Sequence, residues 1–127
     1  MIQYLEENNL PGILFSIDFE KAFDSAQFPF IKKCLNYFNF GIDIQNWVNI
    51  FYKNTSSCIL NTGWSTGFFS IERGVRQGCP LSAYLFIICA EILAANIGDN
   101  NKTQGITFNN REQNLVQFAD DTQLCFY

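Results

Sequence analysis

The final ten residues of this 127-residue chain, Phe118–Tyr127, read FADDTQLCFY and place two aspartates side by side. Apolar and polar residues alternate from Val116 to Phe118 and again from Gln123 to Phe126. This alternation predicts two half-buried strands, with Ala119–Asp121 as the turn between them. Asp is common in turns, so an ordinary acidic turn is one interpretation of the pair. The stretch contains no Lys, Arg or His, so its charge must be balanced by another part of the chain or by something that the chain binds.

The composition predicts a single folded domain. The chain is 48% hydrophobic and 17% aromatic, which argues against disorder. The longest nearly apolar run, residues 83–97, is shorter than the roughly 20 residues that cross a bilayer, and the N-terminus lacks the features of a signal peptide. We therefore expect no membrane partner. Five scattered cysteines without a C-x-x-C pair predict reduced thiols and an intracellular location, nuclear or cytoplasmic.

Two further properties restrict the chemistry. The chain has no His, which removes His-based catalysis and most transition-metal sites. The remaining chemistry must use carboxylates, which suit hard cations such as Mg²⁺. The net charge of −4 counts against a nucleic-acid partner, unless the chain is an acidic catalytic core separated from basic surroundings.

Periodicity and turn signals predict alternating short strands and helices. The predicted elements are a buried strand over Gly12–Phe19, a helix opened by Pro29 and stopped by Gly41, a second helix over 44–54, a hairpin over 57–71 closed around Asn61–Gly63, a third helix from Pro80 to Ile97, and a terminal hairpin. The third helix is apolar on most sides, so we expect it to be buried on most sides. This order predicts an α+β fold, with helices on one face of a small antiparallel sheet.

Asp18 stands near the end of the first predicted strand, in an apolar setting. A lone charge there is costly unless it is paired or bound to a metal. Lys21 is close enough in sequence to pair with it. Alternatively, Asp18 converges with Asp120, although most of the chain separates them. If the first strand lies beside the terminal hairpin, both carboxylates emerge at one edge, where two divalent ions about 3.5–4 Å apart are the arrangement used for phosphoryl transfer.

A third segment, GVRQGCPLS at Gly74–Ser82, is a glycine-punctuated loop that leads into the helix beginning at Pro80. Its glycines let the backbone approach a ligand closely, and a helix N-terminus favours anions. The side chain of Gln77 both donates and accepts hydrogen bonds. Taken alone, the loop is more simply interpreted as a tight entry into a core helix, with Arg76 solvated.

Three segments occur in a fixed order: DFEKAFDS (Asp18–Ser25), RGVRQGCPLS (Arg73–Ser82) and FADD (Phe118–Asp121). Together they resemble reverse transcriptases of the non-LTR retrotransposon (LINE-like) type, from about Gly12 to the C-terminus. The wording DFEKAFD is closer to that branch than to group II intron maturases, and RNA-directed RNA polymerases usually carry Gly before the Asp pair. The resemblance implies a polymerase palm-like fold and an RNA-directed DNA polymerase that adds dNTPs to a DNA primer on an RNA template.

The resemblance also implies a metal site. Asp18, the backbone carbonyl of Phe19 and Asp120 would bind two Mg²⁺ ions, for which Mn²⁺ is an alternative. Asp121 would add charge near the metals with a weaker direct role.

A nucleotide pocket is implied as well. Phe23 resembles the steric gate that packs against the sugar and excludes a 2′-hydroxyl, although it is one of 14 Phe and its ordinary interpretation is core packing. Gln77 and Gly78 resemble the loop that lines the nucleotide pocket and touches the template. Asp24 is expected to be structural, capping the following turn.

The chain departs from the family pattern at its ends. No Lys or Arg precedes Asp18, and only six residues follow Asp121. We therefore expect residues 1–127 to be a single partial palm domain of a larger polyprotein, without the N-terminal part of the fingers and without the thumb, and inactive by itself. The alternatives are a degraded, non-catalytic retroelement remnant, or a small acidic α+β interaction module whose aspartates are only turn residues.

Overall fold

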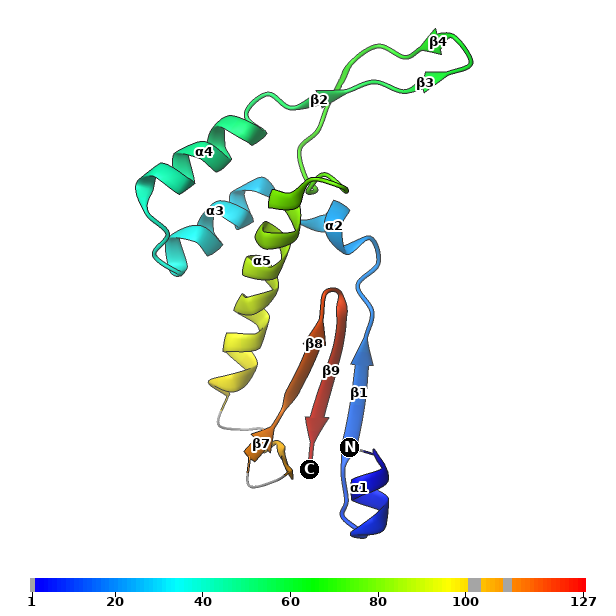
Figure 1. The fold of residues 1–127 in the computed structure, drawn as a ribbon, viewed down its shortest axis with the longest axis vertical. Coiled ribbons are helices and arrows are strands. Elements are labelled where there is room, and N and C mark those ends of the chain that lie inside the picture. Colours follow the sequence, from blue (N-terminus) through cyan, green and yellow to red (C-terminus); the bar gives the residue numbers. More distant parts are fainter. Residues whose placement is uncertain (1, 101–103, 109–110) are drawn as a thin grey trace. The chain divides into compact units, whose positions relative to one another are not determined.

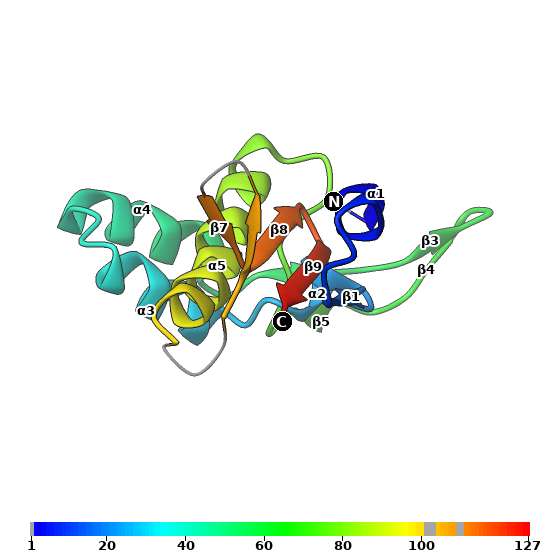
Figure 2. The same cartoon turned by 90° about the horizontal axis from the view of Figure 1, so that it is seen from below.

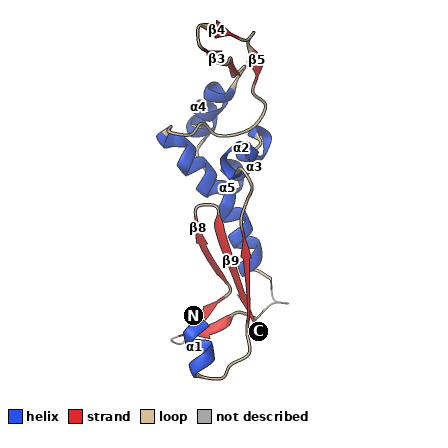
Figure 3. Cartoon of the chain, turned by 90° about the vertical axis from the view of Figure 1, so that its right-hand side faces the viewer, coloured by secondary structure: helices blue, strands red, loops and turns tan. Residues whose placement is uncertain are grey.

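The computed structural model describes residues 2–100, 104–108 and 111–127 (Figure 1). Helices and short antiparallel strand pairs both occur, as the predicted α+β class requires (Figure 3). The chain divides into two compact units. Unit 1 comprises Met1–Ala22 and Ala90–Tyr127, and unit 2 comprises Phe23–Cys89.

Unit 1 is built around a three-stranded antiparallel sheet. Its strands are β1 (Ile13–Ile17), β8 (Leu115–Phe118) and β9 (Asp121–Phe126). The last strand in sequence, β9, lies between the other two (Figures 1 and 2). The first strand and the terminal hairpin were both predicted, and their pairing in one sheet is confirmed.

The prediction that the first strand is buried is wrong. Ile13 and Phe15 on β1 are 61% and 55% exposed. Among the described strands, β1 pairs only with β9 and is therefore an edge strand, and its apolar sequence did not lead to burial. The buried residues of unit 1 include Ala22, Ile106 and Cys125, together with Thr122.

The remaining elements of unit 1 are short. They are α1 (Ile2–Glu7), which the sequence did not predict, and a pair of strands, β6 (Ile106–Phe108) and β7 (Arg111–Gln113). At Gly12, an added Cβ would lie 2.9 Å from the end of the Leu5 side chain, so a larger residue there would require that side chain to shift.

Unit 2 begins in α2 (Ala22–Ser25) and contains a helix pair, α3 (Phe28–Tyr37) and α4 (Ile42–Tyr52). Pro near the start of α3 suits the first helical turn, whose N–H groups have no partner within the helix. α3 ends before Asn39, whose φ of 54° is left-handed. Gly41 was predicted to stop this helix, but it caps the start of α4 instead. The core of unit 2 consists of Ile31, Cys34, Leu35, Val48, Val75, Leu85 and Phe86.

Two small strand pairs follow α4 and confirm the predicted hairpin. They are β2 (Ser56–Ser57) with β5 (Phe69–Ser70), and β3 (Leu60–Asn61) with β4 (Trp64–Ser65). The turn residues Thr62 and Gly63 both have positive φ, as a type I′ hairpin turn requires. The hairpin carries large apolar side chains that remain open to solvent, with Trp64 82% exposed.

The long helix α5 (Pro80–Gly98) starts in unit 2 and continues into unit 1. Its start at Pro80 was predicted, but the prediction that it is buried on most sides is wrong. Only Ser82, Leu85 and Phe86 are buried, whereas Tyr84 is 66% exposed. α5 is long and apolar enough to cross a bilayer by length and composition, a test that core helices of soluble proteins also pass. The apolar residues of α5 favour its burial, but whether it is buried depends on which elements pack against it.

Candidate functional site

The tip of the β8–β9 hairpin carries the aspartate pair. The turn consists of Ala119 and Asp120 alone, because Asp121 already pairs with Phe118 across the two strands. The predicted turn, Ala119–Asp121, was therefore one residue too long. Ala119 has a φ of 53°, which is uncommon for a residue other than glycine and marks a tight, strained turn.

The register of the sheet brings Asp18 to this same end. Ile17 pairs with Thr122, so Asp18, the next residue, continues alongside the position of Asp121. Figure 1 shows the end of β1 and the β8–β9 tip at one end of the sheet. Asp18 and Asp121 are exposed and Asp120 is half-buried. Asp18 and the Asp120–Asp121 pair, which are far apart in the sequence, thus lie at the same end of the sheet.

A buried threonine and a half-buried glutamine form a polar pair one position inside the tip. Thr122 is 1% exposed, and Gln117 Nε2 donates a hydrogen bond to Thr122 Oγ1 at 3.1 Å. The two residues face each other across β8 and β9. Sequence analysis did not single them out, since a Thr and a Gln in a strand carry no signal until the register is known. The bond fixes the pairing directly behind the aspartates.

The donor chemistry at this edge suits a hard divalent cation, because carboxylate oxygens are the ligands that Mg²⁺ prefers. However, the described residues include no group of three or more His, Cys, Asp or Glu side chains gathered closely enough to hold a metal ion. Asp18 and the Asp120–Asp121 pair therefore lie at the same end of the sheet without forming a closed metal-binding cluster. Mg²⁺ commonly binds in this way, through one or two protein carboxylates with substrate phosphates completing its shell.

In unit 2, the first two sequence motifs are joined by their backbones. The Val75 N–H donates to the Phe23 carbonyl, and the Gly74 N–H donates to the Ala26 carbonyl, each at 2.7 Å. Gly74 has a φ of 95°, and a Cβ there would lie 3.2 Å from the Asp24 Cα. Only glycine fits this junction without strain. The sequence showed the glycine of RGVRQG, but it did not indicate that this glycine packs against the segment from Phe23 to Ala26.

Phe23 stacks on Phe86 of α5, with ring centroids 4.7 Å apart and the planes 15° apart. Phe23 itself is half-buried, so one part of the ring packs in unit 2 while the rest is accessible. Asp24 lies inside α2 and is exposed, rather than standing before a helix as the predicted cap. The packing of Phe23 is observed, and its action on a nucleotide sugar stays a prediction.

The loop before α5 lines a cavity of about 670 Å³ within unit 2. Gln77 and Arg76 contribute to its wall, together with Arg73 and Gly74. Gly78 has a φ of 80° with open space around it and is not among the lining residues. The predicted nucleotide loop thus lines a cavity through Gln77, whereas Gly78 does not line it.

Cys79, at the start of α5, is a further chemically distinct residue that the motif analysis passed over. The backbone N–H groups of Leu81 and Ser82 stabilise its thiolate and lower the pKa of the thiol. In contrast, burial raises the pKa of Cys89 to about 12. All five cysteines are free thiols, as predicted.

Comparisons with known proteins agree with these motifs. Residues 2–126 match the family described as reverse transcriptase (RNA-dependent DNA polymerase). The chain is 27% identical to a transposon TX1 protein of 149 kDa from Xenopus laevis, over 98% of this chain and 10% of that protein. It is 29% identical to a retrovirus-related Pol polyprotein from a type-1 retrotransposable element R2 of Popillia japonica, over 95% of this chain and 20% of the relative.

A third relative, the Pol polyprotein from the type-2 retrotransposable element R2DM of Drosophila melanogaster, is 30% identical over 86% of this chain and 10% of its own length. The chain therefore spans only about 10–20% of these relatives. The family match covers nearly every residue, including all three motifs and the carboxylate edge. The chain belongs to the reverse transcriptase family, and it is of the non-LTR retrotransposon type that its motifs predict.

Proposed function

We propose that this chain forms the catalytic core of an RNA-directed DNA polymerase, which adds dNTPs to a DNA primer on an RNA template. The observation that carries the proposal is the register of the sheet, which places Asp18 at the same edge as the Asp120–Asp121 pair. Family membership supplies the reaction class, and the sheet edge supplies the acidic groups that this reaction requires.

In the proposed mechanism, Asp18 and Asp120 each contribute a carboxylate oxygen to divalent ions, and the backbone carbonyl of Phe19 adds a further oxygen. Reverse transcriptases use divalent ions, and we propose two Mg²⁺ ions, with Mn²⁺ as an alternative. When bound, the ions supply activation of the attacking hydroxyl and stabilisation of the leaving oxygen. Asp121 is exposed at the first pair of β9 and contributes charge, so its loss should be less harmful.

The nucleotide itself would be recognised by residues of unit 2. We propose that Phe23 acts as the sugar gate through the part of its ring that does not pack on Phe86. Gln77 would hydrogen-bond the nucleotide or template, and the left-handed backbone at Gly78 would let the loop approach closely. This assignment implies a polymerase palm inside a larger polyprotein that supplies fingers and thumb.

The proposal is compatible with an inactive chain in isolation. Positioning of ions, triphosphate and primer end supplies much of the rate in phosphoryl transfer, and the chain spans only about 10–20% of its relatives. A degraded remnant would share the fold but not the chemistry, whereas an acidic interaction module would not require carboxylates to meet at one edge.

The test is Mn²⁺ binding to the purified chain, followed by electron paramagnetic resonance with and without a dNTP. We expect Asp18→Asn and Asp120→Asn each to weaken binding at least about tenfold, because each removes a charged ligand. Asp121→Asn should weaken it less. The matched control is Asp43→Asn on α4, an exposed acidic residue of unit 2 that is not part of the proposed metal site. Binding that is the same in Asp18→Asn, Asp120→Asn and the control would refute the metal site.

Primer extension on an RNA template separates the catalytic proposal from a remnant. We expect no extension by the 127-residue chain alone, and extension by a polyprotein that contains this segment, lost on Asp120→Asn. Metal binding without extension in the larger protein would favour the remnant.

A further inference from the structure

Cys79 occupies the position immediately before α5, where the first N–H groups of a helix have no partner within the helix. Its carbonyl accepts a hydrogen bond from the Ser82 N–H at 3.0 Å, and its sulfur interacts with the N–H groups of Leu81 and Ser82. Ser, Thr, Asp and Asn are preferred at this position, because their side-chain oxygens accept hydrogen bonds from such groups. When the residue is cysteine, the same groups favour its thiolate form.

A buried hydroxyl beside this thiol is a second, independent observation. Ser82 is 2% exposed, and among the described residues its Oγ has no partner in hydrogen-bonding geometry. Two polar side chains lie near it, the Cys79 thiol and the Tyr52 phenol. Burial raises the pKa of Tyr52, so the phenol stays neutral, and a charged acceptor forms a stronger hydrogen bond than a neutral one. The Ser82 hydroxyl therefore gains its best partner when Cys79 is a thiolate.

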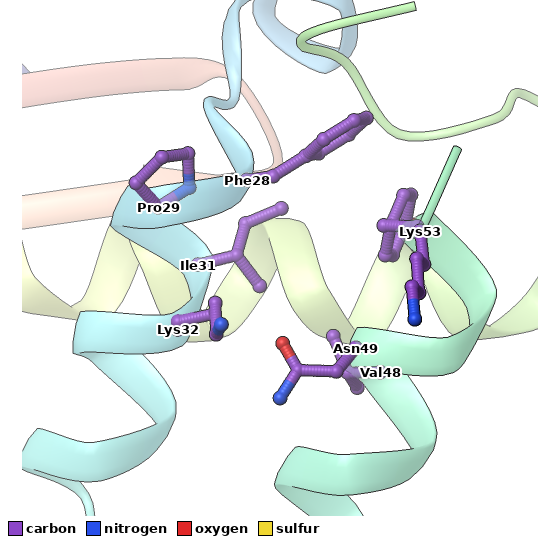
Figure 4. A pocket seen from close by; sticks show the side chains of 8 residues that line it. Phe28, Pro29, Ile31, Lys32, Val48, Asn49 and Lys53 are labelled. Carbon is purple, nitrogen blue, oxygen red and sulfur yellow. The ribbon is translucent and has the colours of Figure 1, made fainter. Parts of the chain in front are cut away.

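The surroundings of the thiol favour a reagent that carries negative charge. Cys79 is half-buried, so a small molecule can reach it. The cavity of about 440 Å³ between α3 and α4, drawn in Figure 4, is lined by Tyr52 but, among the described residues, by no cysteine. In contrast, Arg73 and Arg76 line the cavity beside the Gln77 loop, and the Arg76 guanidinium also favours the Cys79 thiolate. An anionic reagent would therefore meet cations on the side of this loop.

We propose that Cys79 is a site of reversible S-thiolation by a small anionic disulfide. The Cys79 thiol releases its proton to water, and the thiolate attacks one sulfur of the disulfide. A bond forms between the Cys79 Sγ and that sulfur, the S–S bond of the reagent breaks, and its other half leaves as a thiolate that takes up a proton. Cys79 is oxidised to a mixed disulfide and the reagent is reduced to one free thiol. Attack by a second thiol reverses the reaction.

The modification would control the polymerase activity, and this consequence rests on the proposed function. Cys79 directly follows Gln77 and Gly78, the residues assigned above to the nucleotide pocket. A glutathionyl group on Cys79 would occupy space beside this loop and would add negative charge that repels an anionic nucleotide. Thiolation should therefore stop primer extension, and a reducing agent should restore it.

The test is incubation of the purified 127-residue chain with oxidised glutathione, followed by mass spectrometry of its peptides. We expect the glutathionyl adduct on Cys79 before Cys58. Cys58 is an internal control, because it is also a half-buried free thiol but lies in the hairpin rather than before a helix. Cys79→Ser should abolish the faster adduct. Because Ser is favoured immediately before a helix, this variant should retain α5, which circular dichroism would show.

Two further variants test the groups around the thiol. Ser82→Ala should slow the adduct on Cys79 about threefold, because the loss of thiolate outweighs the gain in its intrinsic nucleophilicity. Arg76→Gln should slow the reaction with oxidised glutathione but not with cystamine, a cationic disulfide, and salt should reduce the difference. The matched control is Lys33→Gln, which removes an exposed charge of unit 2 that lines neither cavity and should change neither rate.

Equal adduct rates on Cys79 and Cys58 would overturn the site, as would a Ser82→Ala rate equal to that of the unchanged chain. In a polymerase that contains this segment, extension that continues with the adduct in place would overturn the control of activity. The adduct is measured by mass and requires neither metal nor template. The thiolation site can therefore fail while Mn²⁺ binding and primer extension succeed, and the reverse result is equally distinguishable.

Discussion

Substitution of Gly74 by alanine should weaken the junction that joins the first two motifs. Its φ of 95° costs a residue with a Cβ about 1–2 kcal/mol. The new Cβ would also lie 3.2 Å from the Asp24 Cα and 3.3 Å from the Asp24 carbonyl oxygen, and both contacts are with backbone that has little freedom to yield. If the segments separate, the Val75 to Phe23 hydrogen bond weakens, which costs about 1 kcal/mol more. We expect a total loss of about 2–4 kcal/mol.

The chain offers two matched glycines that separate these contributions. Gly78 has a φ of 80° with no atom within 4 Å of an added Cβ, so Gly78→Ala should lose only the conformational part, about 1–2 kcal/mol. Gly67 has neither a left-handed φ nor a close neighbour, so Gly67→Ala should change the free energy of unfolding by no more than about 1 kcal/mol, in the stabilising direction.

The assay is urea unfolding followed by far-ultraviolet circular dichroism. With a slope of about 2 kcal/mol per molar urea, Gly74→Ala should lower the midpoint by about 1–2 M. Equal midpoints for Gly74→Ala and Gly78→Ala would show that the contact with Asp24 contributes nothing. Equal midpoints for Gly74→Ala and Gly67→Ala would refute the junction itself.

Three further outcomes are expected. In a polymerase that contains this segment, Phe23→Val should admit ribonucleotides roughly tenfold better in primer extension, because the smaller side chain leaves room for a 2′-hydroxyl; unchanged discrimination would leave Phe23 as a packing residue. Thr122→Val should lower the free energy of unfolding in urea by about 1 kcal/mol and weaken Mn²⁺ binding, because the Gln117 amide loses its acceptor, whereas Thr122→Ser should retain both properties. Iodoacetamide at about pH 8 should label Cys79 before Cys89, because the lowered pKa of Cys79 leaves more of it as thiolate, whereas the Cys89 thiol, with a pKa raised to about 12, stays protonated. Labelling of Cys89 first, detected by mass spectrometry of the peptides, would contradict this.

Local elements followed from the sequence because their causes are local. The apolar run before Asp18 became β1, and Pro80 began α5. The Asn61–Gly63 turn closed a hairpin, since left-handed conformations at Thr62 and Gly63 match the twist of paired strands. The three motifs, and therefore the family, could also be recognised from the sequence because each motif is a short run of chemically constrained residues.

Neighbour relations were decided by tertiary structure. Alternation of apolar and polar residues assigns side chains to the two faces of a strand, but it does not say which strand lies beside which. The central position of β9, and hence the meeting of Asp18 with the Asp120–Asp121 pair, depends on the pairing of residues far apart in the chain. Sequence analysis left two alternatives for Asp18, pairing with Lys21 or convergence with Asp120. The register puts Asp18 at the same end of the sheet as Asp120, and the convergence of their carboxylates stays a prediction.

The burial of side chains and the positions of cavities were the features least predictable from the sequence. The apolar composition of α5 did not predict its exposed Tyr84, and the run of Ile13–Ile17 did not predict an uncovered edge strand. Gly74 packs closely against the backbone of Asp24, and the ring of Phe28 contacts the ring of Tyr52. Nothing in the sequence of either segment indicates that the two will be neighbours. A hydrophobic side chain gains free energy when it is buried. Whether it is buried depends on which distant element the folded backbone packs against it.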